Sequence, residues 1–264
     1  MEDFKFKKAF GQNFINNHKI IENIVRETFI KENSLVIEIG PGSGVLTKEL
    51  SKYAKYVVAY EIDTRLEDIL DENLKDCHNI EIIFDDFLKR DIMSDIKKYE
   101  YENIYVVANI PYYITTPIIT KLIDSKLPFE SITVMIQKEV GERFMASVGT
   151  KDYSSITVFL NYYFDMKKLF VVTRDNFTPK PNVDSVVISL VRKKDKIKVD
   201  NEELFFMLIR DAFHFKRKNL RNNLKKYDLE KIEEVLNKYQ KDLTVRAEAL
   251  DLNIFVDISN ALNK

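Results

Sequence analysis

The chain has 264 residues, of which 45% are apolar and 31% are charged, and its formal net charge is −1. That length is enough for one large or two modest domains, and the single cysteine, Cys77, excludes a disulfide-stabilised miniprotein. One thiol and three scattered histidines offer no ligand cluster, so no metal site is predicted. No run approaches the ~18 apolar residues of a membrane span, and the first residues lack a signal-peptide pattern. We therefore expect a soluble, cytoplasmic protein that has no membrane partner.

Charge is distributed unevenly along the chain. Residues 167–226 hold 16 Lys or Arg and 7 Asp or Glu, a net charge of +9, while the remaining residues carry a net charge of −10. A segregated basic region favours a polyanionic partner such as a nucleic acid. The alternative is a solvated surface whose lysines serve solubility, and charge alone does not separate the two interpretations.

Short apolar segments alternate with segments of helical spacing through the first half of the chain. Helices are predicted over Ile20–Phe29 (with Asn16 or Asn17 as N-cap), Val45–Lys52 and Arg65–Leu74. Buried strands are predicted over Ser34–Ile39, Tyr56–Tyr60, Ile80–Phe84, Ile104–Ala108 and Ile132–Gln137. This alternation indicates βαβ units and a mostly parallel sheet that is covered on both faces.

The pattern changes in the second half. Ser155–Phe164 and Val183–Val191 are predicted as longer strands, added antiparallel at the edge of the sheet. The polar stretch Arg192–Asp200 is predicted to be a solvated linker. From Glu202 onward the apolar spacing is helical, which predicts a small all-helical second domain.

A glycine cluster, Glu38-Ile39-Gly40-Pro41-Gly42-Ser43-Gly44, follows the first predicted strand. In an open α/β sheet, ligands bind at the carboxyl ends of the strands, where this cluster lies. A dinucleotide fingerprint would place its third glycine where Val45 stands. The spacing E-x-G-x-G-x-G instead resembles the first motif of S-adenosylmethionine-dependent methyltransferases. A purely structural glycine turn is the alternative.

Acidic residues end the next two strands. Glu61 lies where a carboxylate accepts hydrogen bonds from ribose hydroxyls, and the alternative role of a helix N-cap fits Asp63 better. Asp86 could accept from the exocyclic amine of a cofactor adenine. Together with Gly40 and Gly42, these acids predict a site for S-adenosylmethionine.

The tetrapeptide Asn109-Ile110-Pro111-Tyr112 follows the fourth strand. An adenine amine is a poor nucleophile because its lone pair is delocalised into the ring. The Asn109 side-chain oxygen and the Ile110 carbonyl could accept its two hydrogens and direct the lone pair at a methyl group, with Pro111 fixing the backbone. Tyr112 would stack on the base. The alternative is a strand-to-loop proline turn with a surface tyrosine.

These motifs, with others in the same order, resemble those of the ribosomal RNA adenine N6,N6-dimethyltransferases. The resemblance favours the small-subunit enzyme over the macrolide-resistance enzymes of the large subunit. The matching residues are Phe10-Gly11-Gln12-Asn13-Phe14, Glu38–Gly44, Glu61, Asp86, Asn109–Pro117, Gln137-Lys138-Glu139-Val140 with Arg143 and Ala146, Lys151-Asp152-Tyr153, Phe177–Ser185, and Arg217-Lys218 with Leu220–Leu224. Many members carry Asn where this chain has Tyr113, so the edge of its pocket is expected to differ.

The resemblance implies roles for individual residues. The cofactor-binding residues would be Asn13, Ile15, Gly40, Gly42, Glu61, Asp86 and Asn109. Tyr112 and Phe177 would sandwich the target adenine. The residues that contact ribosomal RNA would be Arg217, Lys218, Arg221 and Lys225, within the basic stretch 215–226 of the helical domain. The product would be two adjacent dimethyladenosines near the 3′ end of small-subunit (16S) ribosomal RNA.

We therefore expect an α/β fold in which a Rossmann-like S-adenosylmethionine-dependent methyltransferase domain over residues 1–195 precedes a helical RNA-binding domain over residues 196–264. The expected partner is small-subunit ribosomal RNA or the immature small subunit, and the expected state is a monomer. Three other functions stay open: a large-subunit adenine dimethyltransferase, an assembly factor that acts mainly by binding, and a small-molecule N-methyltransferase. The basic helical domain disfavours the last of these.

Overall fold

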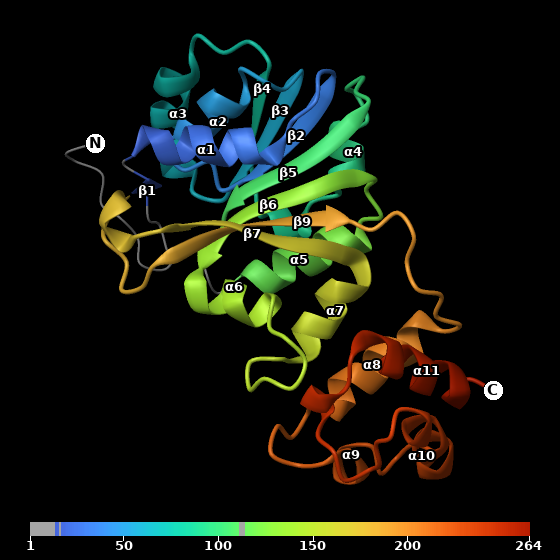
Figure 1. Cartoon of the computed structure of the whole chain (residues 1–264). Coiled ribbons are helices and arrows are strands. Elements are labelled where there is room, and N and C mark those ends of the chain that lie inside the picture. The colour runs from blue at the N-terminus through green and yellow to red at the C-terminus, as the bar shows by residue number, and fades with distance from the viewer. Residues whose placement is uncertain (1–13, 16, 111–113) are drawn as a thin grey trace. The chain divides into compact units, whose positions relative to one another are not determined.

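The chain folds into two compact units, which we describe separately. The computed structural model describes residues 14–15, 17–110 and 114–264 (Figure 1). Contacts divide the chain into a first unit of Met1–Gly141 and Lys167–Arg192 and a second unit of Glu142–Met166 and Lys193–Lys264. The second unit thus takes in residues 142–166 in addition to the C-terminal helices.

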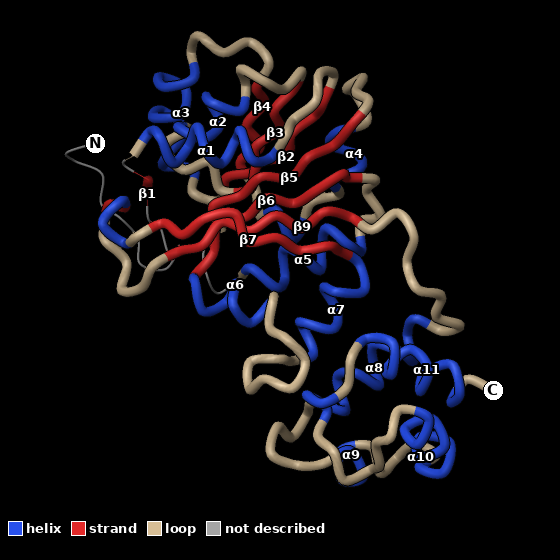
Figure 2. The backbone as a smooth tube through the Cα atoms, in the orientation of Figure 1, coloured by secondary structure: helices blue, strands red, loops and turns tan. Residues whose placement is uncertain are grey.

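A seven-stranded sheet organises the chain (Figure 2). Its strands are β2 (Ser34–Ile39), β3 (Tyr56–Glu61), β4 (Ile80–Phe84), β5 (Asn103–Asn109), β6 (Phe129–Gln137), β7 (Phe164–Val172) and β9 (Ser185–Arg192). Their order across the sheet is β4-β3-β2-β5-β6-β9-β7. The five strands from β4 to β6 pair in parallel and β9 pairs antiparallel to β6. The five predicted parallel strands and the antiparallel addition of residues 183–191 are confirmed.

The helices that accompany these strands follow the predicted pattern. They are α1 (His18–Thr28), α2 (Val45–Leu50), α3 (Glu67–Leu74), α4 (Ile92–Ile96), α5 (Thr115–Asp124) and α6 (Lys138–Phe144), with single turns η2 (Thr64–Leu66), η3 (Phe87–Lys89) and η4 (Arg174–Asn176). Asn17 is the N-cap of α1, because its side chain accepts a hydrogen bond from the Lys19 amide. The apolar face of α1 is buried, which is what its helical spacing requires.

The direction of strand addition reverses between β2 and β5. From β2 the chain builds outward to β4, then crosses back to β5 and continues to β6. Crossovers between parallel strands are right-handed, so the two directions place their helices on opposite faces. Figure 1 shows α1, α2 and α3 on one face and α4 and α5 on the other. The carboxyl ends of β2 and β5 therefore flank the crevice where such sheets bind ligands.

Residues 155–164 do not form the predicted strand. Ser155–Tyr163 is helix α7, and the sequence turns into strand β7 only at Phe164. The β-branched and aromatic residues of this stretch favour a strand, but a capping box joins Ser154 to Thr157 and starts a helix. The buried face of α7 packs against helices α8 and α11, and this packing overrides the local preference.

A second, two-stranded sheet pairs the start of the described chain with a distant segment. Strand β1 (Phe14–Ile15) runs antiparallel to β8 (Phe177–Thr178), with Ile15 opposite Phe177. Two residues a side are too few to form a stable ribbon alone, so the apolar contacts of Phe177 within the first unit must support it.

The second unit is helical, as predicted from residue 202 onward. Besides α7 it contains α8 (Glu202–Ala212), α9 (Leu220–Asn223), α10 (Leu229–Lys238) and α11 (Leu252–Leu262), with the turn η5 (Ala247–Ala249). Their apolar faces form one core, in which Phe205, Leu236 and Phe255 are fully buried. Among the residues that the structure describes, no helix is long and apolar enough to span a membrane.

Candidate active site

A cavity opens at the carboxyl edge of the parallel strands. It encloses about 1150 Å³, part of which is open to solvent. The residues that line it are Phe14, Ile15, Ile21, Glu38–Ser43, Val45, Leu46, Tyr60–Ile62, Asp85–Leu88, Asn109, Ile110, Ile114, Ile118 and Phe177. The glycine cluster, the strand-end acids and the start of the Asn109 tetrapeptide thus share one site, as the fold prediction requires.

The glycine turn approaches the Phe14 ring more closely than a side chain on Gly42 would allow. Gly40, Gly42 and Gly44 have φ angles of 74°, 58° and 81°, in the left-handed region that favours glycine. A Cβ on Gly42 would lie 2.7 Å from Cε1 of Phe14, while one on Gly40 would lie 3.7 Å from the main-chain oxygen of Asn109. The second glycine is therefore needed for space as well as for conformation.

Glu61 holds this turn in place. Its carboxylate accepts hydrogen bonds from the amides of Gly42 (3.1 Å) and Asp63 (2.9 Å), and the residue is 4% exposed. Asp63 is the N-cap of the η2 turn, so capping falls to Asp63 and Glu61 faces the cavity. Burial raises the pKa of Glu61, and the two amides oppose that rise.

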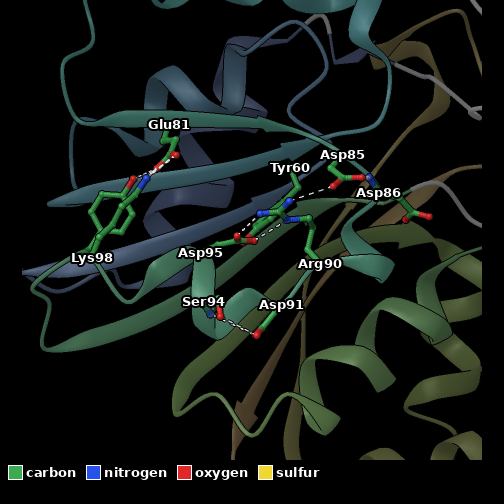
Figure 3. Close-up of polar contacts among 10 residues, drawn as sticks. Tyr60, Glu81, Asp85, Asp86, Arg90, Asp91, Ser94, Asp95 and Lys98 are labelled. Carbon is green, nitrogen blue, oxygen red and sulfur yellow. Dashed lines mark hydrogen bonds and ion pairs between the residues drawn. The ribbon is translucent and has the colours of Figure 1, made fainter.

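The acids after β4 differ in their polar contacts (Figure 3). Arg90 pairs with Asp85 (3.2 Å) and with Asp95, and Asp95 also accepts from the Tyr60 hydroxyl (3.1 Å). Asp86 points away from this network, caps the η3 turn through the Leu88 amide (3.0 Å) and lies at the cavity wall. Both acids line the cavity and each has a basic partner, Arg90 for Asp85 and Lys89 for Asp86 (3.6 Å).

Asn109 and Ile110 lie at the end of β5, next to the glycine turn. Ile39 of β2 is paired with Ala108 of β5, so Gly40 and Asn109 follow paired residues. Ile110 is buried, and its amide donates a hydrogen bond to the Met135 carbonyl (3.3 Å). Asn109 and Ile110 both line the cavity. The amide side chain and the glycine turn are thus on the same rim of the sheet.

Phe177 and Ile15 bring the β1–β8 ribbon to the cavity. Phe177 is 4% exposed and lines the cavity together with Phe14 and Ile15. The pairing of Ile15 with Phe177 joins a proposed cofactor contact to a proposed base-stacking residue. Asn13, Pro111, Tyr112 and Tyr113 lie outside the described residues, so their proposed roles rest on the sequence.

Glu38 is the cavity residue whose role the sequence did not reveal. It is fully buried, and neither of its carboxylate oxygens has a hydrogen-bond partner among the described residues. Burial raises its pKa to about 8, a rise that the nearby Thr47 hydroxyl opposes and the Glu61 carboxylate reinforces. The sequence did contain an indication of this role, because an acid within a predicted buried apolar strand is rare without a ligand or a partner.

The pKa of Glu38 predicts how stability depends on pH. Between about pH 4.5 and pH 8 the folded protein keeps a proton that the unfolded chain has released, so stability from this group is lost as pH rises through that window. Relative to Glu38→Gln, the wild-type free energy of unfolding should fall by up to about 1.4 kcal/mol per pH unit. Urea unfolding of both proteins at several pH values measures the difference, and parallel pH profiles would contradict the assignment.

Gly42→Ala tests the close approach of the glycine turn. The new methyl group would displace the Phe14 ring from the cavity wall, and we expect the affinity for S-adenosylmethionine to fall at least about tenfold, the equivalent of one badly fitted contact. Gly149→Ala is the matched control, because Gly149 has a similar φ of 85° but has nothing within 4 Å of its Cβ position. Calorimetric titration measures both affinities. Equal affinities would show that the ring contact is dispensable.

The predicted RNA contacts lie in the second unit. Arg217 and Lys218 belong to the loop before α9, Arg221 lies within this four-residue helix, and Lys225 follows it. These four cations therefore do not share one helix, and Leu220 and Leu224 between them are buried. Asn219 is the N-cap of α9, because its side chain accepts a hydrogen bond from the Asn222 amide. The helix ends at Asn223, with Leu224 as its C-cap.

The cavity fits S-adenosylmethionine. A buried acid with unpartnered oxygens suits a ligand that carries hydrogen-bond donors, and strand-end carboxylates suit ribose hydroxyls and an adenine amine. The glycine turn lets the main chain approach the ligand closely. Within the described part of the chain, no group of three or more His, Cys, Asp or Glu side chains is placed to hold a metal ion.

Comparison with known proteins finds relatives over nearly the whole chain. A ribosomal RNA small subunit methyltransferase A from Streptococcus thermophilus is 43% identical, covering 99% of this chain and 93% of its own. A dimethyladenosine transferase structure from Plasmodium falciparum has a TM-score of 0.78 at 29% identity, covering 93% of this chain and 95% of its own. The structure of the 23S rRNA methyltransferase ErmE has a TM-score of 0.73 at 27% identity, and the match covers 95% of this chain and 100% of ErmE.

The sheet order, the cavity and these neighbours confirm the predicted Rossmann-like methyltransferase fold with a helical C-terminal region. The family model for ribosomal RNA adenine dimethylase matches residues 3–264. Because this match and a relative at 43% identity both span almost the whole length, the chain belongs to the ribosomal RNA adenine dimethylase family.

Proposed function

We propose that this protein transfers methyl groups from S-adenosylmethionine to the N6 amines of two adjacent adenines near the 3′ end of small-subunit ribosomal RNA. The observation that carries the proposal is the position of Asn109 and Ile110 beside the Gly40 turn in one cavity. The names of the relatives at 42–44% identity favour the small subunit as the source of the RNA.

Residues of the first unit would hold the methyl donor. Glu61 would accept from its ribose, Asp86 from its adenine amine, and Glu38 would face its remaining donors. Gly40 and Gly42 leave room for the ligand at the turn, and Ile15 closes the wall. Asn13 completes the set by resemblance.

The chain contributes positioning to the methyl transfer. When bound, S-adenosylmethionine supplies a methyl group on a sulfonium and leaves as a neutral thioether. The side-chain oxygen of Asn109 and the carbonyl of Ile110 would accept the two hydrogens of the adenine amine, which localises its lone pair and aims it into the cavity. Tyr112 and Phe177 would hold the base by stacking. No acid is needed for the leaving group, and the methylated amine would lose its proton to water.

The second unit would bind the RNA. Its loop and short helix carry Arg217, Lys218, Arg221 and Lys225, which would contact phosphates, while the shape of the RNA would set the register. We further propose that the protein acts as a monomer in the cytoplasm and takes part in small-subunit biogenesis.

Mass spectrometry of ribosomal RNA tests the function. The protein is incubated with labelled methyl donor and either immature small subunits or large-subunit RNA, and the modified nucleosides are mapped. Labelled N6,N6-dimethyladenosine at two adjacent positions of the small-subunit RNA is the expected result. Label in the large-subunit RNA alone would favour the second candidate, a large-subunit dimethyltransferase, to which the structural similarity with ErmE points.

A further inference from the structure

The loop that joins α8 to α9 is seen in Figure 1, and it carries an exposed aromatic side chain among cations. Phe215 is 49% exposed, and His214, Lys216, Arg217 and Lys218 around it are exposed as well. A single exposed apolar residue is common on protein surfaces and needs no explanation by itself. The shape and the charge of this loop are what set Phe215 apart.

The loop is held in one conformation by the side chain of Asn223. The Nδ2 group of Asn223 donates to the carbonyl oxygens of Ala212 (2.7 Å), Phe215 (3.2 Å) and Lys218 (3.5 Å). The amide of Lys218 donates to the carbonyl of Phe215 at 2.9 Å, which closes a turn around Arg217. The ring of Phe215 is therefore displayed by a pre-formed loop, and ordering it on binding costs little conformational entropy.

The surroundings of the ring are cationic. The Lys218 ammonium lies 4.3 Å from the centroid of the Phe215 ring, and the His214 ring meets it edge-on with centroids 4.4 Å apart. Among the described residues, Lys216, Arg217 and Lys218 form no ion pair with an acid, whereas Arg221 and Lys226 pair with Glu233 and Asp211. The uncompensated charge is thus concentrated in the loop that carries the aromatic ring.

We propose that Phe215 stacks on an unpaired nucleotide of the bound RNA while the flanking cations hold its phosphates. An aromatic face next to cations is the arrangement with which proteins bind unpaired bases, since every base has a π-face and every nucleotide a phosphate. A duplex keeps its bases stacked inside, so the loop distinguishes unpaired from paired RNA. This proposal rests on the proposed RNA contact of the second unit and adds a specificity-determining residue to it.

Binding titrations at fixed salt test the proposal. The full chain is titrated with two RNAs of equal length, a hairpin that carries unpaired adenines and a perfect duplex. Phe215→Leu should weaken hairpin binding about tenfold and leave duplex binding unchanged, because stacking on one base contributes roughly this much. Phe215→Tyr should bind the hairpin normally. Phe29→Leu is the control, since Phe29 is 72% exposed but lies at the end of α1 in the first unit.

A fluorescence signature separates stacking from a structural role. The chain has no tryptophan, so Phe215→Trp introduces a single indole whose emission should be quenched on binding the hairpin but not the duplex. Phe29→Trp should show no quenching. If Phe215→Leu weakens both RNAs equally, or neither, or if the indole is not quenched, the stacking role is overturned. Weakened binding to ribosomal particles without any effect on naked RNA would also overturn it, in favour of a protein contact.

Arg217→Gln shows whether the underlying RNA contact exists. It should weaken the hairpin and the duplex alike and reduce the slope of log affinity against log salt by about one. If that variant has no effect on either RNA, the proposed RNA contact of this loop fails. If it behaves as expected while Phe215→Leu does not, only the stacking role fails.

Discussion

Asn109→Ala is expected to lower the yield of dimethyladenosine by at least about a hundredfold, the usual scale for losing one positioning group in an active site. The side chain lies at the carboxyl end of β5, half-buried at the cavity wall and adjacent to the Gly40 turn. Without its oxygen, one hydrogen of the adenine amine has no acceptor and the lone pair stays delocalised in the ring. Single-turnover assays with saturating methyl donor and small-subunit RNA measure the loss at the chemical step.

Asn103→Ala provides the matched control for this experiment. Asn103 begins the same strand, so it lies at the amino edge of the sheet and away from the cavity. Both variants should unfold at temperatures close to that of the wild type, because Asn109 is not part of the apolar core. A near-normal yield from Asn109→Ala would refute the assigned role of its side chain.

The same variant separates methylation from ribosome assembly. If Asn109→Ala is inactive yet still binds immature small subunits and supports their maturation in cells, then binding is the main duty of the protein. If maturation fails together with methylation while the subunits are still bound, the chemical step is what assembly requires.

The sheet could be predicted from the sequence because its strands are buried on both faces. Every residue of β2 is buried, and its apolar run of Leu35, Val36 and Ile37 indicates a parallel strand even though Glu38 interrupts it. The turn residues then mark where each strand ends, and the carboxyl-edge rule brings Gly40, Glu61 and Asn109 together without any knowledge of side-chain contacts. The cavity contains all three of these residues.

Other features depend on contacts that a linear pattern does not encode. Residues 155–163 have strand preferences, and their helix is decided by a capping box and by packing in the second unit. The pairing of Ile15 with Phe177 joins segments more than half the chain apart, so no local signal predicts it. The side chain of Asn223 donates to three carbonyl oxygens in and next to the loop before α9. The folded backbone brings these oxygens together, and the sequence around Asn223 does not indicate it.

Glu61→Ala is expected to weaken S-adenosylmethionine binding about a hundredfold. The carboxylate does two things at once: it accepts the amides of Gly42 and Asp63, which fixes the glycine turn, and it faces the cavity where a ribose would donate to it. A hydrogen bond to a charged group contributes about 1.5–3 kcal/mol, so losing the ligand contacts and leaving the Gly42 amide unpaired reaches this size. Calorimetric titration of the full chain with the methyl donor measures the change.

Glu61→Gln divides the two contributions. Its NH2 group replaces one carboxylate oxygen, so either the Gly42 amide or the Asp63 amide loses its acceptor while the remaining oxygen still accepts hydrogen bonds. The affinity of Glu61→Gln should therefore lie between those of wild type and Glu61→Ala. Glu22→Ala is the control, because Glu22 is an exposed acid on α1. S-adenosylmethionine should raise the unfolding temperature most in the wild type, less in Glu61→Gln and least in Glu61→Ala, since stabilisation by a ligand depends on its concentration relative to Kd. If Glu61→Ala bound S-adenosylmethionine with wild-type affinity, Glu61 would not contact the ribose, and its assignment as a cofactor-binding residue would be wrong.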